Sequence, residues 1–199
     1  ILTLKNVYKL FSNDISKEII LNIFPQFKYY ERLKLISTLR PEIRCKFDKY
    51  LILALLIVDQ SSNYEYFCHK YKTSNNLKNK LKNISTNFED LKNKKFYSEE
   101  NIKKLIYLSN KDSVRDLLLF SMCAINKTKN LNIEKLIDYV NVCQSPQFPV
   151  NGNYLKKHGY ETGPALGKKL KSLEEQWIKN NFVIDDIAVK KSLGESNNN

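Results

Sequence analysis

Residues 48–59 read Asp48-Lys49-Tyr50-Leu51-Ile52-Leu53-Ala54-Leu55-Leu56-Ile57-Val58-Asp59. This apolar run is bounded by aspartates and falls far short of the ~20 residues that a membrane-spanning helix needs. A helix that is apolar nearly all round is buried on several sides. The run therefore predicts a central core helix, and the sequence predicts no membrane partner.

Helical spacing of apolar residues continues on both sides of this run. Upstream, Asp14 is expected to cap a helix that ends before Pro25, and a second helix over residues 29–39 is expected to stop at Pro41. The first of these should present an apolar face made of Ile15, Ile19, Ile20 and Ile23. Downstream, helical patterns open at Ser74 and Ser98, follow Asn110, and cover Ile133 to Val140. No strand-like alternation is present, so the sequence predicts an all-α fold: an irregular multi-helix array followed by a small helical tail subdomain.

A change of composition at residues 144–149 marks the expected domain boundary. Pro146 and Pro149 lie close together there and favour an extended linker. We therefore expect a helical body-like domain over residues 1–145 and a tail domain over residues 146–191. Residues 192–199 are polar and are expected to form a disordered C-terminus.

The charge of the chain points to a polyanionic partner. Its 33 basic and 21 acidic residues give a net charge of +12, for which nucleic acid is the first partner to consider. The alternative is that an AT-rich coding genome produced the excess of lysine. The four cysteines have no CxxC or zinc spacing, and no secretory signal peptide is present, so we expect free thiols and a cytoplasmic location. The sequence begins at Ile1 and its one methionine is Met122, so we expect the chain to be part of a longer protein.

Four of the five glycines lie close together, at Gly152, Gly159, Gly163 and Gly167. Because the rest of the chain is almost free of glycine, this segment needs a particular backbone geometry. Asn151 is expected to cap a short helix that ends at His158, with Gly159 in the left-handed position that follows. Gly152, Gly159 and Pro164 are therefore interpreted as structural turn residues.

The second half of this segment predicts a helix N-terminus that can bind a phosphate. Thr162 is expected to cap the helix, with Pro164 near its first position. Gly163 and Gly167 then lie one turn apart, so another backbone can approach them while free N–H groups attract an anion. The lysines expected to share this RNA-binding site are Lys156, Lys157, Lys168, Lys169 and Lys171. The equally weighted alternative is that the glycines let two helices cross and the lysines form a solvated face.

The spacing of this segment carries a resemblance to a known family. The residues concerned are Phe148, Pro149, Val150, Gly152, Leu155, Gly159, Gly163, Pro164, Gly167 and Leu170. They are similar to the C-terminal signature of the bacterial-type (class II) CCA-adding tRNA nucleotidyltransferases and their poly(A) polymerase relatives. Leu173, Glu174, Trp177, Ile178 and Phe182 also resemble that family's closing helix, and residues 73–81 and 112–119 resemble its body. Asn153 departs from the pattern, because the family commonly has an acidic residue there.

The resemblance implies that this chain is a body and tail that grip tRNA. In this family a preceding head carries the nucleotidyltransferase site, with a Gly-Ser and an Asp-x-Asp element, and a neck carries Glu-Asp-x-x-Arg. None of the three elements occurs in these 199 residues. The implied partners are therefore tRNA and a separate or upstream catalytic head, to which Mg²⁺ and CTP or ATP would belong. No catalytic residue, metal ligand or cofactor is assigned to this chain, and CCA addition and polyadenylation both stay open.

Other candidate chemistry in the sequence is weak. The two histidines, His69 and His158, adjoin no aspartate, and the pair Glu99-Glu100 suits a helix start better than a metal. The pair Asp185-Asp186 has the same interpretation. Trp177 is expected in the core. The aromatic residues Tyr64, Tyr66 and Phe67, interleaved with Lys70 and Lys72, either stack on RNA bases or pack in the core.

Two other functions remain open from the sequence. A helix-hairpin-helix nucleic-acid-binding module has a similar plan, in which a glycine turn leads into a Gly-Pro helix start. The third possibility is a remnant of a split gene that binds nothing.

Overall fold

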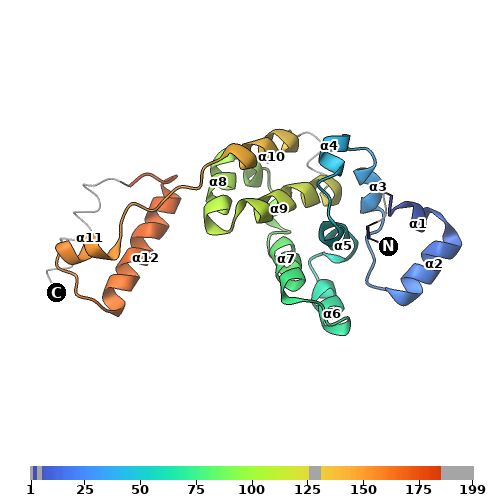
Figure 1. Cartoon of the computed structure of the whole chain (residues 1–199), viewed down its shortest axis with the longest axis horizontal. Coiled ribbons are helices and arrows are strands. Elements are labelled where there is room, and N and C mark those ends of the chain that lie inside the picture. Colours follow the sequence, from blue (N-terminus) through green and yellow to red (C-terminus); the bar gives the residue numbers. More distant parts are fainter. Residues whose placement is uncertain (1, 4–5, 126–130, 185–199) are drawn as a thin grey trace. The chain divides into compact units, whose positions relative to one another are not determined.

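The computed structural model describes residues 2–3, 6–125 and 131–184, and the regular elements found among them are all helices (Figure 1). The all-α prediction is therefore confirmed. The chain divides into two compact units, Ile1–Cys143 and Gln144–Asn199, whereas the expected boundary followed residue 145. The predicted disordered segment 192–199 and the pair Asp185-Asp186 lie outside the described residues.

The first unit contains ten α-helices and two short 3₁₀ helices within its described residues. In chain order they are α1 (Lys9–Ser12), α2 (Asp14–Ile23), α3 (Arg32–Ile36), α4 (Pro41–Arg44), α5 (Lys49–Ile57), α6 (Asn63–Lys70), α7 (Asn75–Thr86), η1 (Asp90–Lys92), η2 (Lys94–Tyr97), α8 (Glu99–Leu108), α9 (Lys111–Ala124) and α10 (Ile133–Val142). The second unit contains α11 (Gly152–Lys157) and α12 (Pro164–Lys179). None of the described helices combines the length and apolar character that crossing a bilayer requires.

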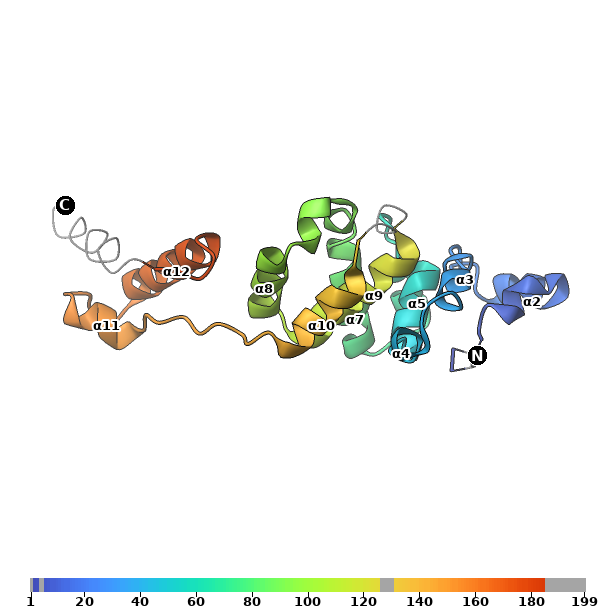
Figure 2. The ribbon, with the colours of Figure 1, turned by 90° about the horizontal axis from the view of Figure 1, so that it is seen from above.

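The core of the first unit is built around α5 and α9. Every residue from Leu51 to Val58 is buried, which confirms the central helix predicted for this run. Helix α9 adds Val114 and residues 117–120 to the same core and contacts α3, α5, α7, α8 and α10. Figure 2 shows α5, α9 and α10 side by side. The continuous apolar run of α5 thus explains why this helix lies in the core.

Side-chain caps fix where the helices begin. The predicted caps Ser74 and Ser98 are confirmed, since each accepts a hydrogen bond from a first-turn N–H. Asn110 caps α9 in the same way. The predicted Asp14 cap is wrong: Asn13 has the extended backbone that lets its side chain accept from Ser16 N at 2.9 Å, whereas Asp14 is already helical.

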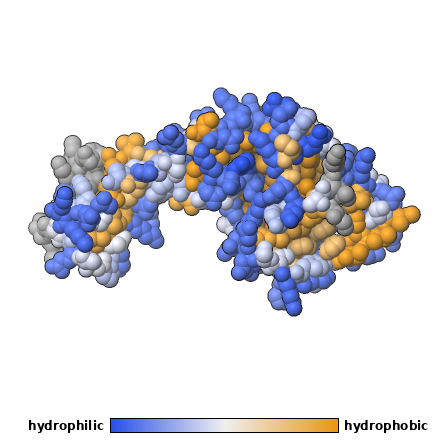
Figure 3. Space-filling model, viewed as in Figure 1, coloured by the Kyte–Doolittle hydropathy of each residue, from blue (hydrophilic) through white to orange (hydrophobic). Residues whose placement is uncertain are grey.

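The N-terminal part differs most from the sequence-based expectations. The helix expected over residues 29–39 is only α3, and Pro41 opens α4 at its first turn rather than ending a helix. Of the expected apolar face of α2, only Ile20 is buried. Ile15, Ile19 and Ile23 are 72%, 54% and 55% exposed, and hydrophobic surface is visible at this end of the unit in Figure 3.

Partly buried polar side chains hold helices of the first unit together. Arg32 Nη1 donates to the carbonyls of Val58 (2.7 Å) and Leu55 (3.2 Å), which closes the C-terminal end of α5. Its guanidinium lies 4.0 Å from the centre of the Tyr29 ring, and burial lowers the Arg32 pKa to about 10. Tyr29 in turn donates to Asp59 Oδ2 at 2.6 Å. These groups therefore hold α3 against α5.

A lysine joins three further helices of the same unit. Lys80 Nζ of α7 contacts Asp48 Oδ2, at the cap of α5, at 2.8 Å and Asp116 Oδ2 of α9 at 3.1 Å. Burial alone would lower the pKa of Lys80, but its two carboxylate partners outweigh burial and raise it. Burial dominates at Asp116 and raises the pKa of that carboxyl. Both aspartates are therefore engaged in holding the fold.

Candidate nucleic-acid interface

The second unit is a small two-helix structure with its own core. Val150, Leu155 and Leu173 are buried at its centre. Trp177 is 3% exposed and packs against Phe148, with ring centres 5.3 Å apart, and against Phe182, at 4.9 Å. The prediction that Trp177 is a core residue is confirmed. Its ring is therefore not available to stack on a nucleic-acid base.

Helix α11 has the expected start and end. The Asn151 side chain accepts a hydrogen bond from Tyr154 N at 3.0 Å, so Asn151 caps the helix as predicted. His158 follows the last helical residue; its Nδ1 lies 2.9 Å from the carbonyl oxygen of Tyr154. Gly159 has a φ of +88°, the left-handed conformation that favours glycine. The chain can therefore reverse at Gly159 and enter α12.

The N-terminus of α12 differs from the expectation in one respect. Gly163, rather than Thr162, precedes the first helical residue, and no side chain caps the helix. Pro164 occupies the first position, as predicted, and has no N–H to satisfy. Within the described chain, the N–H groups of Ala165 and Leu166 therefore have no capping partner. Two donors and the positive end of a 16-residue helix dipole face outward at this point.

The glycines of this unit differ in what surrounds them. A methyl group at Gly152 would lie 3.6 Å from Leu166 Cδ2, an ordinary contact between α11 and α12. Methyl groups at Gly163 and Gly167 would meet no described atom within 4 Å. The alternative that these two glycines let helices of this chain cross closely therefore has no support at Gly163 and Gly167, and the approach of an outside backbone stays a prediction. Their open side faces outward from the two helices.

The predicted lysines surround this open side unequally. Gly163, Gly167 and Lys171 follow one another at intervals of four residues, so they lie along one side of α12. Lys168 and Lys171 are exposed and form no ion pair within the described chain, whereas Lys169 is half-buried and has contacts of its own. Lys156 and Lys157 are exposed at the end of α11. Residues 144–184 carry six lysines and three glutamates, so the described part of this unit is basic.

No arrangement for acid–base or metal chemistry appears in the described residues. Neither of the two histidines, His69 and His158, lies in a catalytic pairing, and Glu99 and Glu100 occupy the first turn of α8. No group of three or more His, Cys, Asp or Glu side chains in the described chain is placed to hold a metal ion. Among the described residues, no group of acids therefore fits the divalent metal that nucleotidyl transfer requires.

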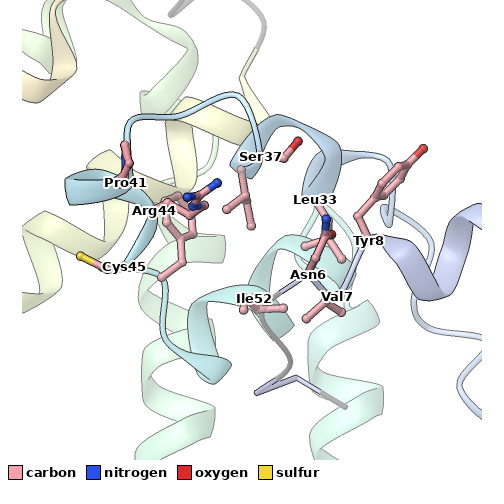
Figure 4. A pocket seen from close by; sticks show the side chains of 11 residues that line it. Asn6, Val7, Tyr8, Leu33, Ser37, Pro41, Arg44, Cys45 and Ile52 are labelled. Atoms are coloured by element: carbon pink, nitrogen blue, oxygen red, sulfur yellow. The ribbon is translucent and has the colours of Figure 1, made fainter.

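A cavity of about 450 Å³ opens in the first unit, and the sequence did not predict it (Figure 4). Its walls combine polar and apolar side chains, and the apolar ones include Val7, Leu33 and Ile52, which come from three separate segments. Figure 4 shows the Arg44 guanidinium pointing from α4 toward this space. Arg44 forms no ion pair among the described residues. Arg44 is the cation among the residues that line the cavity.

Comparison with known proteins identifies a family to which this sequence is similar. A family model described as tRNA nucleotidyltransferase domain 2, putative, matches residues 46–190. The match begins just before α5 and continues through α12, while the α1–α4 region precedes it. A stretch of 62 residues is 32% identical to the protein "CCA tRNA nucleotidyltransferase 1, mitochondrial" from Danio rerio. That stretch is 31% of this chain and 14% of the length of the relative.

Proposed function

Because the chain belongs to the family of tRNA nucleotidyltransferase domain 2, we propose that it is a tRNA-binding part of an enzyme that builds tRNA 3′ ends. In this proposal the first unit is the body and the second unit is the tail of a class II CCA-adding enzyme. The catalytic head would be a further domain or a separate chain. The name of the Danio rerio relative favours CCA addition over polyadenylation.

The observation that carries the proposal is the open glycine side of α12. Glycine at a helical position costs about 1 kcal/mol relative to alanine. At Gly167 no described atom would contact an added methyl group, so packing within the chain does not account for that cost. A backbone that approaches from outside accounts for it. The two uncapped N–H groups beside Gly163 then suit a phosphate of that backbone.

The lysines extend this surface in a way that suits A-form RNA. A-form RNA helices hide their base edges in a deep groove, so proteins contact their phosphates and 2′-hydroxyls instead. Lys168 and Lys171 flank the glycine side, and Lys156 and Lys157 lie on the preceding helix. Lys169 is the weakest member, because it already has contacts within the chain. We expect binding that depends on shape and charge more than on base sequence.

The test is the affinity of the full chain for tRNA as a function of salt. Wild type should prefer tRNA to duplex DNA at matched salt, and the logarithm of its affinity should fall with the logarithm of the salt concentration. Lys168→Gln and Lys171→Gln should each make this slope shallower by about 0.9 for a phosphate contact on a duplex stem. Lys179→Gln is the matched control, because it changes an exposed lysine in the last turn of the same helix.

Three outcomes would contradict the proposal. A preference for duplex DNA would favour the helix-hairpin-helix alternative, which the family match does not support. A salt slope near zero would favour a remnant without binding. An equal effect of Lys179→Gln and Lys171→Gln on the salt slope would show that the glycine side of α12 is not part of the interface.

A further inference from the structure

A hollow of about 420 Å³ lies beside the start of α6, in the first unit. Two segments distant in sequence line it: residues 25–28, which precede α3, and residues 61–66, which include the first turn of α6. Protein pockets that take small organic ligands range from about 300 to 1,000 Å³. The hollow is therefore large enough for one nucleotide.

Hydrogen bonds hold the floor of this hollow together. The Asn63 side chain is buried, and its Nδ2 donates to the carbonyl oxygens of Gln26 at 3.0 Å and Ile57 at 2.8 Å. These bonds fix the turn that contains Gln26 against the end of α5. Gln26 is itself buried. The two segments that line the hollow are therefore joined at its floor.

One wall of the hollow is an aromatic ring without a partner in the described chain. Tyr66 is 57% exposed, and its side chain makes no hydrogen bond or ring contact there. Its neighbours Tyr64 and Phe67 are both 6% exposed and belong to the core, so for these two the packing alternative is correct. Tyr66 is the member of this aromatic group that is left to stack on a base.

The rim of the hollow carries an available positive charge. Lys28 forms no ion pair among the described residues. The nearby Asp59 carboxylate already accepts from the Tyr29 hydroxyl (2.6 Å) and Ser61 N (2.8 Å). Glu65 accepts from the Tyr64 hydroxyl at 3.1 Å. The neighbouring acids are therefore engaged by hydrogen bonds. Burial alone would raise the Asp59 pKa, but hydrogen bonds and the charge of Lys28 lower it. Lys28 makes no ion pair with Asp59, so its ammonium group can bind an external anion.

We propose that this hollow binds one unpaired nucleotide of RNA, with its base stacked on Tyr66 and its phosphate bound by Lys28. Aromatic faces beside lysines bind single-stranded RNA with little base preference, because every base has a π-face. The Ser62 side chain makes no capping hydrogen bond, so its hydroxyl can bind a ribose 2′-OH. The inference rests on the proposed function in so far as the nucleotide belongs to the tRNA held by α12, but the hollow and α12 bind different parts of the RNA.

The experiment uses the full chain and a single-stranded RNA pentamer with a central 2-aminopurine. Stacking on Tyr66 should quench the 2-aminopurine fluorescence of the pentamer, and Tyr66→Phe should retain this quenching. Tyr66→Ala should abolish it and weaken binding by about tenfold, in the range of losing one base–aromatic stack. Lys28→Gln should make the salt slope shallower by about 0.7, for one phosphate contact on a single strand. Lys70→Gln is the control, because Lys70 is exposed on the same helix but lies over Tyr71, outside the hollow.

Failure of this inference can be distinguished from failure of the proposed function. Wild-type affinity and quenching in Tyr66→Ala would overturn the nucleotide site, whatever the lysines of α12 do to tRNA binding. A chain that binds the pentamer through Tyr66 but has no affinity for tRNA would support the site and overturn the proposed function. An equal effect of Lys70→Gln and Lys28→Gln would also overturn the site.

Discussion

At Gly167, helix stability and RNA binding are expected to favour different residues. It lies in the first turns of α12, has no special backbone conformation, and faces no described atom at the position of a Cβ. Most glycines kept in helices have a packing reason inside the protein. At Gly167 no described atom supplies such a reason, and the proposed function assigns it to the approach of RNA. The same residue can therefore lower the stability of the helix and permit a close approach by RNA.

Replacing Gly167 by alanine should raise stability and weaken tRNA binding. Removing the helix penalty should increase the free energy of unfolding by about 0.5–1 kcal/mol. The added methyl group should crowd the RNA backbone and weaken tRNA affinity by about tenfold, within the 1–3 kcal/mol typical of overpacking. Urea unfolding and tRNA titration of the same protein measure the two effects. Ser172→Ala, an exposed change on another side of α12, should leave tRNA affinity unchanged; equal affinity in both variants would contradict the prediction.

At the scale of elements, the joint between α3 and α5 combines a cation with a carboxylate. Arg32 closes the end of α5, and Tyr29 connects Arg32 to Asp59, the second residue after the helix. Burial alone would raise the Asp59 pKa, but hydrogen bonds from Ser61 and Tyr29 outweigh burial and hold this pKa below its ordinary value. The ionised carboxylate is therefore favoured in the folded state.

This joint predicts a dependence of stability on pH. A carboxyl with a lowered folded pKa stabilises the fold above its unfolded pKa, and that contribution is lost as the pH falls through the folded pKa. Wild type should thus lose free energy of unfolding between about pH 5 and pH 2, and Asp59→Asn should be less stable at pH 7 but lose less on acidification. Urea unfolding at pH 7, 5 and 3 measures this. Asp138→Asn, at an exposed aspartate without a partner in the described chain, should keep the wild-type loss.

Features encoded by neighbouring residues could be predicted from the sequence, whereas features formed by distant segments could not. Ser74, Ser98 and Asn151 cap helices through their own side chains, and α5 is apolar through its own sequence, so these elements were correctly predicted. The errors at Asp14 and Thr162 were shifts of a single residue, since the backbone conformation decides which of two neighbours becomes the cap. Periodicity showed that α2 has an apolar face but not that Ile15, Ile19 and Ile23 would be exposed. The hollow at Tyr66 and the cavity at Arg44 combine distant segments, which no local pattern indicates.

At the scale of the whole molecule, we expect RNA binding to belong to this chain and nucleotidyl transfer to a separate head. Transfer of a nucleotidyl group needs carboxylates that hold divalent metal ions in line with the attacking oxygen. The first unit engages Asp48 and Asp116 with Lys80, and Asp59 with Tyr29. These three acids therefore serve the fold. The proposed binding surfaces instead consist of lysines, glycines and one exposed ring.

The 199-residue chain should therefore bind tRNA without extending it. In the presence of Mg²⁺, CTP, ATP and a tRNA that lacks its 3′ CCA, we expect saturable binding and no incorporation of labelled nucleotide, because no group of acids among the described residues is placed to hold the metals. Binding is measured by titration in the same buffer, so that a lack of incorporation cannot be explained by a lack of tRNA binding. A complete CCA-adding enzyme acting on the same tRNA is the positive control. Incorporation by the pure chain would show that it has a catalytic centre and would contradict the assignment of chemistry to a separate head.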